Sequence, residues 1–143
     1  MVRFAAWFWM GMVFGVSFIA TPVKFRAMSL TMPVALDVGH VTLHALNRIE
    51  WFFAAVLLLL SVRAVRDGRI DRVPLILAVG ASVLVALQSL WLLPMLDVRT
   101  AEIIAGRPQP PSPLHSLFIG AEALKLLLLG LVGWAAGRSN PKG

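Results

Sequence analysis

Residues 37–50, DVGHVTLHALNRIE, constrain the fold more than any other segment, because they join seven polar or ionisable side chains directly to a long apolar run. The run that follows, WFFAAVLLLLSV, is too apolar for the surface helix of a soluble protein. The two segments give about 26 residues of helix, which at ~1.5 Å per residue are long enough to cross a bilayer. The polar half of this helix must therefore enter the membrane as well.

The composition indicates an integral membrane protein whose main partner is the lipid bilayer. Hydrophobic residues make up 59% of the chain and charged residues only 14%, well below the rough quarter that is typical of soluble proteins. The net charge is +6, and most of the basic residues lie in short loops beside apolar spans. This pattern sets membrane orientation, so the positive charge does not support nucleic-acid binding. Because the chain has no cysteine, disulfides, thiolate metal sites and thiol redox chemistry are excluded.

Four apolar runs predict an all-α, polytopic integral membrane four-helix bundle that forms a single domain. The expected spans are residues 4–20, 36–62, 73–94 and 114–136. Proline at position 22 is expected to end or kink the first span, and the following apolar stretch to form an interfacial or re-entrant connection. Residues 97–113, with four prolines, predict an extended, polyproline-like external loop.

Charge distribution predicts the orientation. The N-terminus, the second loop and the C-terminal tail carry seven Lys and Arg residues, whereas the first and third loops carry four. The positive-inside rule therefore favours cytoplasmic termini. We expect the protein in the inner (plasma) membrane of a bacterium, with the polar starts of the second and fourth spans facing outward.

Two of the expected spans carry a stripe of polar side chains, and both stripes begin at the same membrane face. On the second span the residues follow at steps of three, four and three, and they are Asp37, His40, His44 and Asn47. On the fourth span they follow at steps of seven and three, and they are His115, Glu122 and Lys125. If the two spans pack together, the histidines gather near the outer surface.

Four charged residues then gather near the midplane: Arg48, Glu50, Glu122 and Lys125. A mutually paired quartet is the least costly way to hold such charges in hydrocarbon, and depth favours pairing Arg48 with Glu122 and Glu50 with Lys125. Together with Asn47 they form the predicted ligand-binding or ion-pair network. The alternative is a structural network that only fixes the helix register.

His40 and His44 have the i, i+4 spacing that lets two imidazoles bind one divalent metal ion, and His115 or Asp37 would complete the site. A haem between His44 and His115 is a second cofactor hypothesis. The competing interpretation is that these are interfacial histidines bonded to backbone or loop groups. The HxxxH pattern lacks the glutamate of a zinc protease, and no serine lies in a nucleophile motif.

Two motifs, GMVFGVSFIATPVKF and PSPLHSLFIGAEALKLLLL, resemble the TMEM205-like, DUF4149-type small four-helix membrane proteins. The resemblance implies the same fold and carries no agreed biochemical activity. Export of metal-containing drugs has been proposed for the animal member of that family, and here it would rest on His115, Glu122 and Lys125. The absence of cysteine removes the soft ligands that such a substrate would require.

The sequence therefore predicts a non-enzymatic membrane protein that binds or conducts a small polar or ionic ligand between its second and fourth spans. The histidines would line the entrance and the charged residues the interior. The alternative is an accessory structural subunit of a larger membrane complex, or a homo-oligomer, whose polar network is structural. A third hypothesis is a metal- or haem-binding membrane redox protein.

Overall fold

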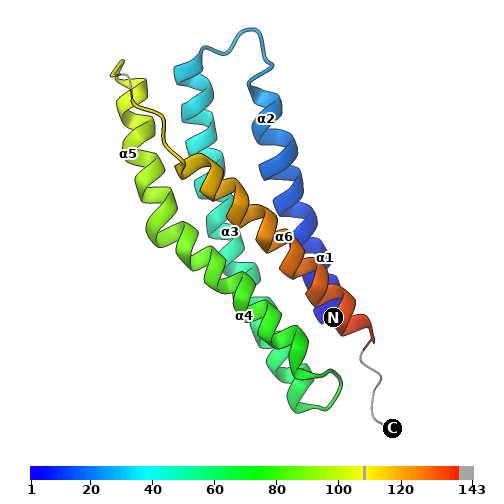
Figure 1. Cartoon of the computed structure of the whole chain (residues 1–143). Helices are drawn as coiled ribbons and strands as arrows, with labels where there is room; N and C mark the ends of the chain where they lie inside the picture. Colours follow the sequence, from blue (N-terminus) through cyan, green and yellow to red (C-terminus); the bar gives the residue numbers. More distant parts are fainter. Residues whose placement is uncertain (108, 139–143) are drawn as a thin grey trace.

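The structure, a computed structural model, describes residues 1–107 and 109–138. In this part of the chain every regular element is helical, and the elements join into four antiparallel rods (Figure 1). All four rods are long and apolar enough to cross a membrane. The prediction of an all-α, polytopic membrane fold is therefore confirmed.

The rods are built from eight elements. The first rod joins α1 (Val2–Val13), the π-helix η1 (Phe14–Ala20) and α2 (Thr21–Lys24). The second is α3 (Met32–Arg66), and the third joins α4 (Arg72–Leu87), η2 (Gln88–Leu92) and α5 (Leu93–Ile104). The fourth is α6 (Leu114–Arg138).

Two prolines lie inside continuous rods, and this corrects the expected loops. The first rod continues past Pro22, and the third continues past Pro94 to Ile104, so residues 97–104 are helical rather than extended. In each rod a π-helical stretch precedes the proline, and the last amide before it bonds to the carbonyl five residues back. The missing proline N–H then falls in the first turn of a new α-helical segment, where no donor is needed.

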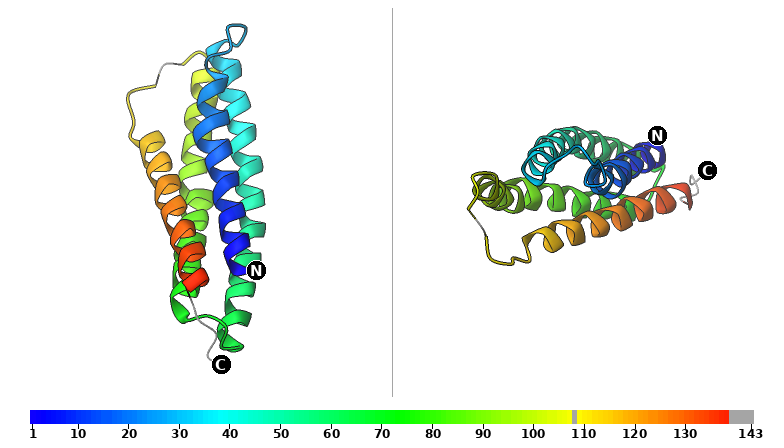
Figure 2. Two further views of the ribbon diagram at one scale, coloured as in Figure 1. Left: turned by 90° about the vertical axis from the view of Figure 1, so that its right-hand side faces the viewer. Right: turned by 90° about the horizontal axis from the view of Figure 1, so that it is seen from above.

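The rods differ in length, and this leaves one end of the bundle open. Met1, Arg69 and Ala136 line one cavity, so the start of the first rod, the end of the fourth rod and the 67–71 turn lie at the same end of the bundle. We call this end the basic end. At the opposite end, which we call the histidine end, α3 and α5 project beyond the start of α6 (Figure 2). At ~1.5 Å per residue α3 is about 52 Å long, more than the ~30 Å hydrocarbon core requires.

The main apolar core occupies the half of the bundle nearer the basic end. There α6 packs against α1 and α4, and α3 packs against α4 and α1. Its largest fully buried apolar side chains include Trp9, Leu57 and Leu129. A smaller cluster of Leu92, Leu93 and Phe118 lies toward the histidine end. Large apolar side chains are also exposed on every rod, as contact with a lipid bilayer requires.

Candidate functional site

Polar side chains from all four rods meet inside the bundle, around the ammonium of Lys125. Lys125 Nζ lies 2.5 Å from Glu50 Oε1 and 2.7 Å from Glu122 Oε1, and it donates to Gln88 Oε1 at 2.7 Å. Lys125 is 0% exposed, Glu122 1% and Glu50 2%. One buried cation is thus shared by two carboxylates.

The remaining bonds of the cluster come from three neutral donors. Gln88 Nε2 donates to Glu122 Oε1 at 2.7 Å, and Ser17 Oγ donates to Glu122 Oε2 at 2.8 Å. Trp9 Nε1 donates to Glu50 Oε1 at 3.2 Å. We call these six residues the buried polar cluster: Trp9, Ser17, Glu50, Gln88, Glu122 and Lys125. Each of its carboxylates has donors, as buried charges require.

The two π-helical stretches supply two of these donors. Ser17 lies in η1 and Gln88 in η2, and both bond to Glu122. A π-helical turn inserts a residue into the helical register and so changes which face later side chains occupy, and such turns are frequent at functional sites. The prolines and the cluster are therefore linked: the same local irregularity accommodates the proline and presents a polar group inward.

The predicted charged quartet is only partly correct. The expected pair between Glu50 and Lys125 is present. The pairing of Arg48 with Glu122 is wrong, because Arg48 is exposed and has no ion pair among the described residues. Residues two apart on a helix point to opposite sides, so Arg48 and Glu50 cannot both face the bundle interior. The Arg48 side chain is instead exposed.

Asn47 belongs to a second hydrogen-bonded group, separate from the buried polar cluster. Its Oδ1 accepts a hydrogen bond from Ser89 Oγ, which in turn accepts one from Trp51 Nε1 at 2.8 Å. This chain joins α3 to η2 without touching Glu50 or Lys125. Asn47 is therefore placed as a helix-to-helix contact rather than as part of the buried polar cluster.

Two of the predicted metal ligands come together with an aspartate that the sequence did not single out. His40 Nδ1 lies 3.1 Å from Asp97 Oδ1, and His44 Nε2 lies 2.9 Å from Asp97 Oδ2. The two imidazole centroids are 4.5 Å apart. His40, His44 and Asp97, which we call the His-Asp trio, join α3 to α5 at the histidine end.

The other two predicted ligands do not join the trio. Asp37 is exposed on α3, and His115 is exposed at the start of α6. Neither makes a hydrogen bond or ion pair with the residues that the structure describes. The metal site with Asp37 or His115 as third ligand is not assembled, and the haem hypothesis of His44 with His115 stays a prediction.

Two cavities lie between the trio and the buried polar cluster. A cavity of about 320 Å³ has Ser17 and Glu122 in its lining, and also His115. A smaller cavity of about 80 Å³ is lined by residues that include Lys24, His40, Asp97 and again His115. His115 thus borders both cavities.

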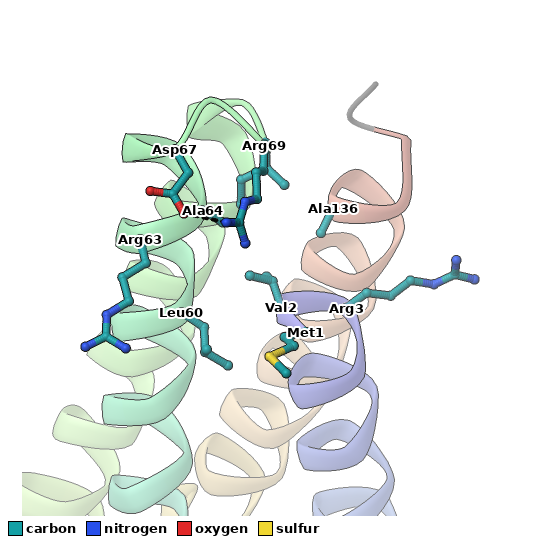
Figure 3. A pocket seen from close by; sticks show the side chains of 10 residues that line it. Met1, Val2, Arg3, Leu60, Arg63, Ala64, Asp67, Arg69 and Ala136 are labelled. Carbon is teal, nitrogen blue, oxygen red and sulfur yellow. Dashed lines mark ion pairs between the residues drawn. The ribbon is translucent and has the colours of Figure 1, made fainter. Parts of the chain in front are cut away.

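A third cavity, of about 340 Å³, lies at the basic end (Figure 3). Met1, Val2 and Leu60 lie along it, and Asp67 pairs with Arg69 at 3.1 Å beside its rim. The side chains of Arg3 and Arg63 extend away from its centre in Figure 3. None of the site residues predicted from the sequence lines this cavity, so it is not part of the candidate site.

Four functional candidates were missed from the sequence: Trp9, Ser17, Gln88 and Asp97. Isolated tryptophan, serine or glutamine residues in apolar spans carry no periodic signal. Asp97 was assigned to the proline-rich loop. Continuing the third span as a helix through Pro94 would have placed Asp97 on a helix rather than in a loop.

The comparisons with known proteins agree with this architecture. A family model described as a domain of unknown function (DUF4149) matches residues 4–103, which cover the first three rods and leave out α6. No curated protein and no solved structure matches the chain. The match confirms the DUF4149 part of the resemblance seen in the sequence, and no comparison bears out the TMEM205-like part. Because the matched segment is more than half of the chain, the protein belongs to the DUF4149 family.

Proposed function

We propose that this membrane protein binds or conducts a small polar or ionic ligand, which reaches Glu122 through the 320 Å³ cavity. The observation that carries the proposal is that Glu122 and Ser17, which are bonded to each other, both line that cavity. A cavity of about 300 Å³ or more, with mainly apolar walls and a few convergent polar groups, is typical of small-ligand sites. The site differs from the sequence prediction in that it lies between the first rod and α6, and excludes Arg48.

The charge of the buried polar cluster favours a cation or a proton as the ligand. Its ionisable groups are two carboxylates and one ammonium, so the fully ionised cluster carries one surplus negative charge. An unbalanced charge at this depth costs at least about 2.5 to 3.5 kcal/mol even on the insertion scale. A bound cation or an additional proton removes that cost, whereas an anionic ligand increases it.

The 320 Å³ cavity reaches Glu122 from the histidine end, which favours a binding site over an open channel in this conformation. Glu122 lies about 24 Å along α6 from Arg138, at ~1.5 Å per residue. Between them the bundle is filled by fully buried Trp9, Leu129 and Val132. On the other side of Glu122 the cavity continues to His115. Conduction would therefore require a second conformation in which the apolar core opens.

We also propose that both termini are cytoplasmic, so that the cavity opens to the outside. The support is the positive-inside rule, with seven Lys and Arg residues in the N-terminal, second-loop and C-terminal segments against four in the first and third loops.

The proposal is tested by measuring binding and flux of H⁺, Na⁺, K⁺ and tetramethylammonium in lipid nanodiscs and proteoliposomes. We expect at least one of these probes to bind or cross, with loss of activity in Glu122→Gln. The matched control is Glu102→Gln. Glu102 lies near the end of α5, where it pairs with Arg107, so this substitution should leave the activity unchanged. If no probe binds or crosses, or if Glu122→Gln retains full activity, the proposal is wrong.

A further inference from the structure

We propose that His40, His44 and Asp97 bind a divalent first-row transition metal ion of the Zn²⁺ type. This inference does not rest on the proposed function, because the His-Asp trio lies outside the 320 Å³ cavity. It replaces the metal site expected from the sequence with one that has a carboxylate from a different rod.

The geometry of the trio suits a single ion. His40 and His44 lie one helical turn apart on the same face of α3, and both present a ring nitrogen to the carboxylate of Asp97. One ligand atom from each of the three residues lies within 4.8 Å of the others. Ligands at Zn–N and Zn–O distances of about 2.0 to 2.2 Å are roughly 3.3 to 3.5 Å apart around a tetrahedral ion. Small side-chain rotations therefore suffice to admit the metal.

The donor set selects the class of metal. Two imidazoles and one carboxylate suit Zn²⁺, Co²⁺, Ni²⁺ or Cu²⁺, whereas Mg²⁺ and Ca²⁺ prefer oxygen ligands alone. Three protein ligands leave at least one coordination position open. The adjoining 80 Å³ cavity, which His40, Asp97 and His115 line, offers room there for water or for a fourth side chain. The trio is about one-third exposed, so an ion is able to reach it from water.

One nearby charge weakens the proposed site. The ammonium of Lys24 borders the same small cavity and lies so close to Gly39 that a Cβ added there would come within 2.1 Å of it. A positive charge at this position repels a divalent cation. We therefore expect Lys24→Gln to bind Zn²⁺ a few-fold more tightly than the unmodified protein.

The competing explanation is that the trio only joins α3 to α5 by hydrogen bonds, with Asp97 accepting from both rings. The two explanations differ in what they predict for added metal. If the trio only joins the two helices, Zn²⁺ does not change the free energy of unfolding. If the trio is a metal site, the protein takes up one ion, and its free energy of unfolding rises by RT ln(1 + [L]/Kd), where [L] is the free metal concentration.

The test uses the full-length protein with a tag that contains no histidine, stripped with a chelator and titrated with Zn²⁺ and Co²⁺. We expect one equivalent of either ion, a visible Co²⁺ absorption band typical of low coordination number, and no uptake of Mg²⁺. Asp97→Asn and His44→Gln should weaken binding by roughly 10- to 100-fold or more. Asp37→Asn is the matched control, because Asp37 is an exposed aspartate on α3 outside the trio.

Two results would overturn the proposal. The first is substoichiometric uptake of both ions by the folded, unmodified protein, which requires no variant. The second is unchanged binding in folded Asp97→Asn and His44→Gln, which would assign the metal to other residues. If either variant fails to fold, the Co²⁺ spectrum of the unmodified protein still decides, since a spectrum typical of six oxygen or water ligands contradicts a site with two imidazoles.

Discussion

Replacing Lys125 with methionine is expected to be among the most damaging single substitutions in this protein. Methionine has a similar length and apolar volume but carries no charge. Its introduction leaves the Glu50 carboxylate with Trp9 as its remaining donor, and the Glu122 carboxylate with Ser17 and Gln88. Two negative charges then share a buried site without a cation.

The magnitude follows from the contacts that are lost. Removing one partner of a buried ion pair costs about 3 to 5 kcal/mol. The loss also leaves Gln88 Oε1 without its donor, which adds about 1 to 3 kcal/mol. Because both effects share one side chain they overlap, and we expect a decrease of about 4 to 6 kcal/mol in the free energy of unfolding. That is a large part of the ~5 to 15 kcal/mol that stabilises a typical domain.

The same reasoning predicts an asymmetry between the cation and its carboxylates. Glu50→Gln removes the surplus negative charge and leaves Lys125 paired with Glu122, so we expect it to cost less than about 2 kcal/mol. Combining Glu50→Gln with Lys125→Met removes one of the two stranded charges. The double variant should therefore be at least about 1 kcal/mol more stable than the sum of the single effects predicts.

The assay is reversible unfolding in mixed micelles with increasing denaturing detergent, followed by circular dichroism. Arg48→Met is the matched control, because Arg48 lies on α3 near Glu50 but is exposed and has no ion pair among the described residues. We expect it to leave the free energy of unfolding within about 1 kcal/mol of the unmodified protein. Equal effects of Lys125→Met and Arg48→Met, or strictly additive effects in the double variant, would contradict this prediction.

Three further predictions address packing and topology. Gly133→Ala should lower the free energy of unfolding by about 1 to 3 kcal/mol, because its added Cβ would lie 2.6 Å from a tryptophan ring of α1. The control is Gly120→Ala, whose added Cβ meets nothing within 4 Å and should have little effect. Equal shifts in the thermal unfolding of the two variants would contradict this prediction. Ser61→Ala should raise stability by about 1 kcal/mol, since this buried hydroxyl has no hydrogen-bond partner among the described residues, and a loss of stability would show that it has one. In intact cells a membrane-impermeant maleimide should label Ser112→Cys but not Arg69→Cys, and the reverse pattern would invert the proposed orientation.

The fold was largely predictable because apolar runs long enough to span a bilayer admit few structures other than helices. What the sequence could not indicate was how the helices pass their prolines. Pro22 was expected to end or kink the first span, and the third span was expected to end near Pro94, yet a π-helical stretch before each proline preserves the rod. Whether a proline ends a helix or is accommodated depends on packing against neighbouring rods, which a single sequence does not display.

The site was predictable where opposite charges had to meet inside an apolar bundle, and this identified Glu50 with Lys125. Helical geometry excludes Arg48 from this interior site, since Arg48 lies two residues from the buried Glu50 and points to the opposite side of α3. Ser17 and Gln88 were beyond prediction because their inward orientation follows from the π-helical stretches. Where the membrane boundaries fall along the rods, and which membrane holds the protein, stay predictions.

Access of water-soluble reagents to Glu122 tests the proposed ligand site most directly. Because the chain contains no cysteine, single cysteines report accessibility without a background. Ser17→Cys, beside Glu122 in the cavity, should react with a small cationic thiol reagent in nanodiscs, and Ser61→Cys, 0% exposed in the core, should not. We predict that the cysteine at position 17 reacts, and that a bound cation slows this reaction. An inert Ser17→Cys in a folded protein would contradict the proposal that a polar ligand reaches the buried polar cluster.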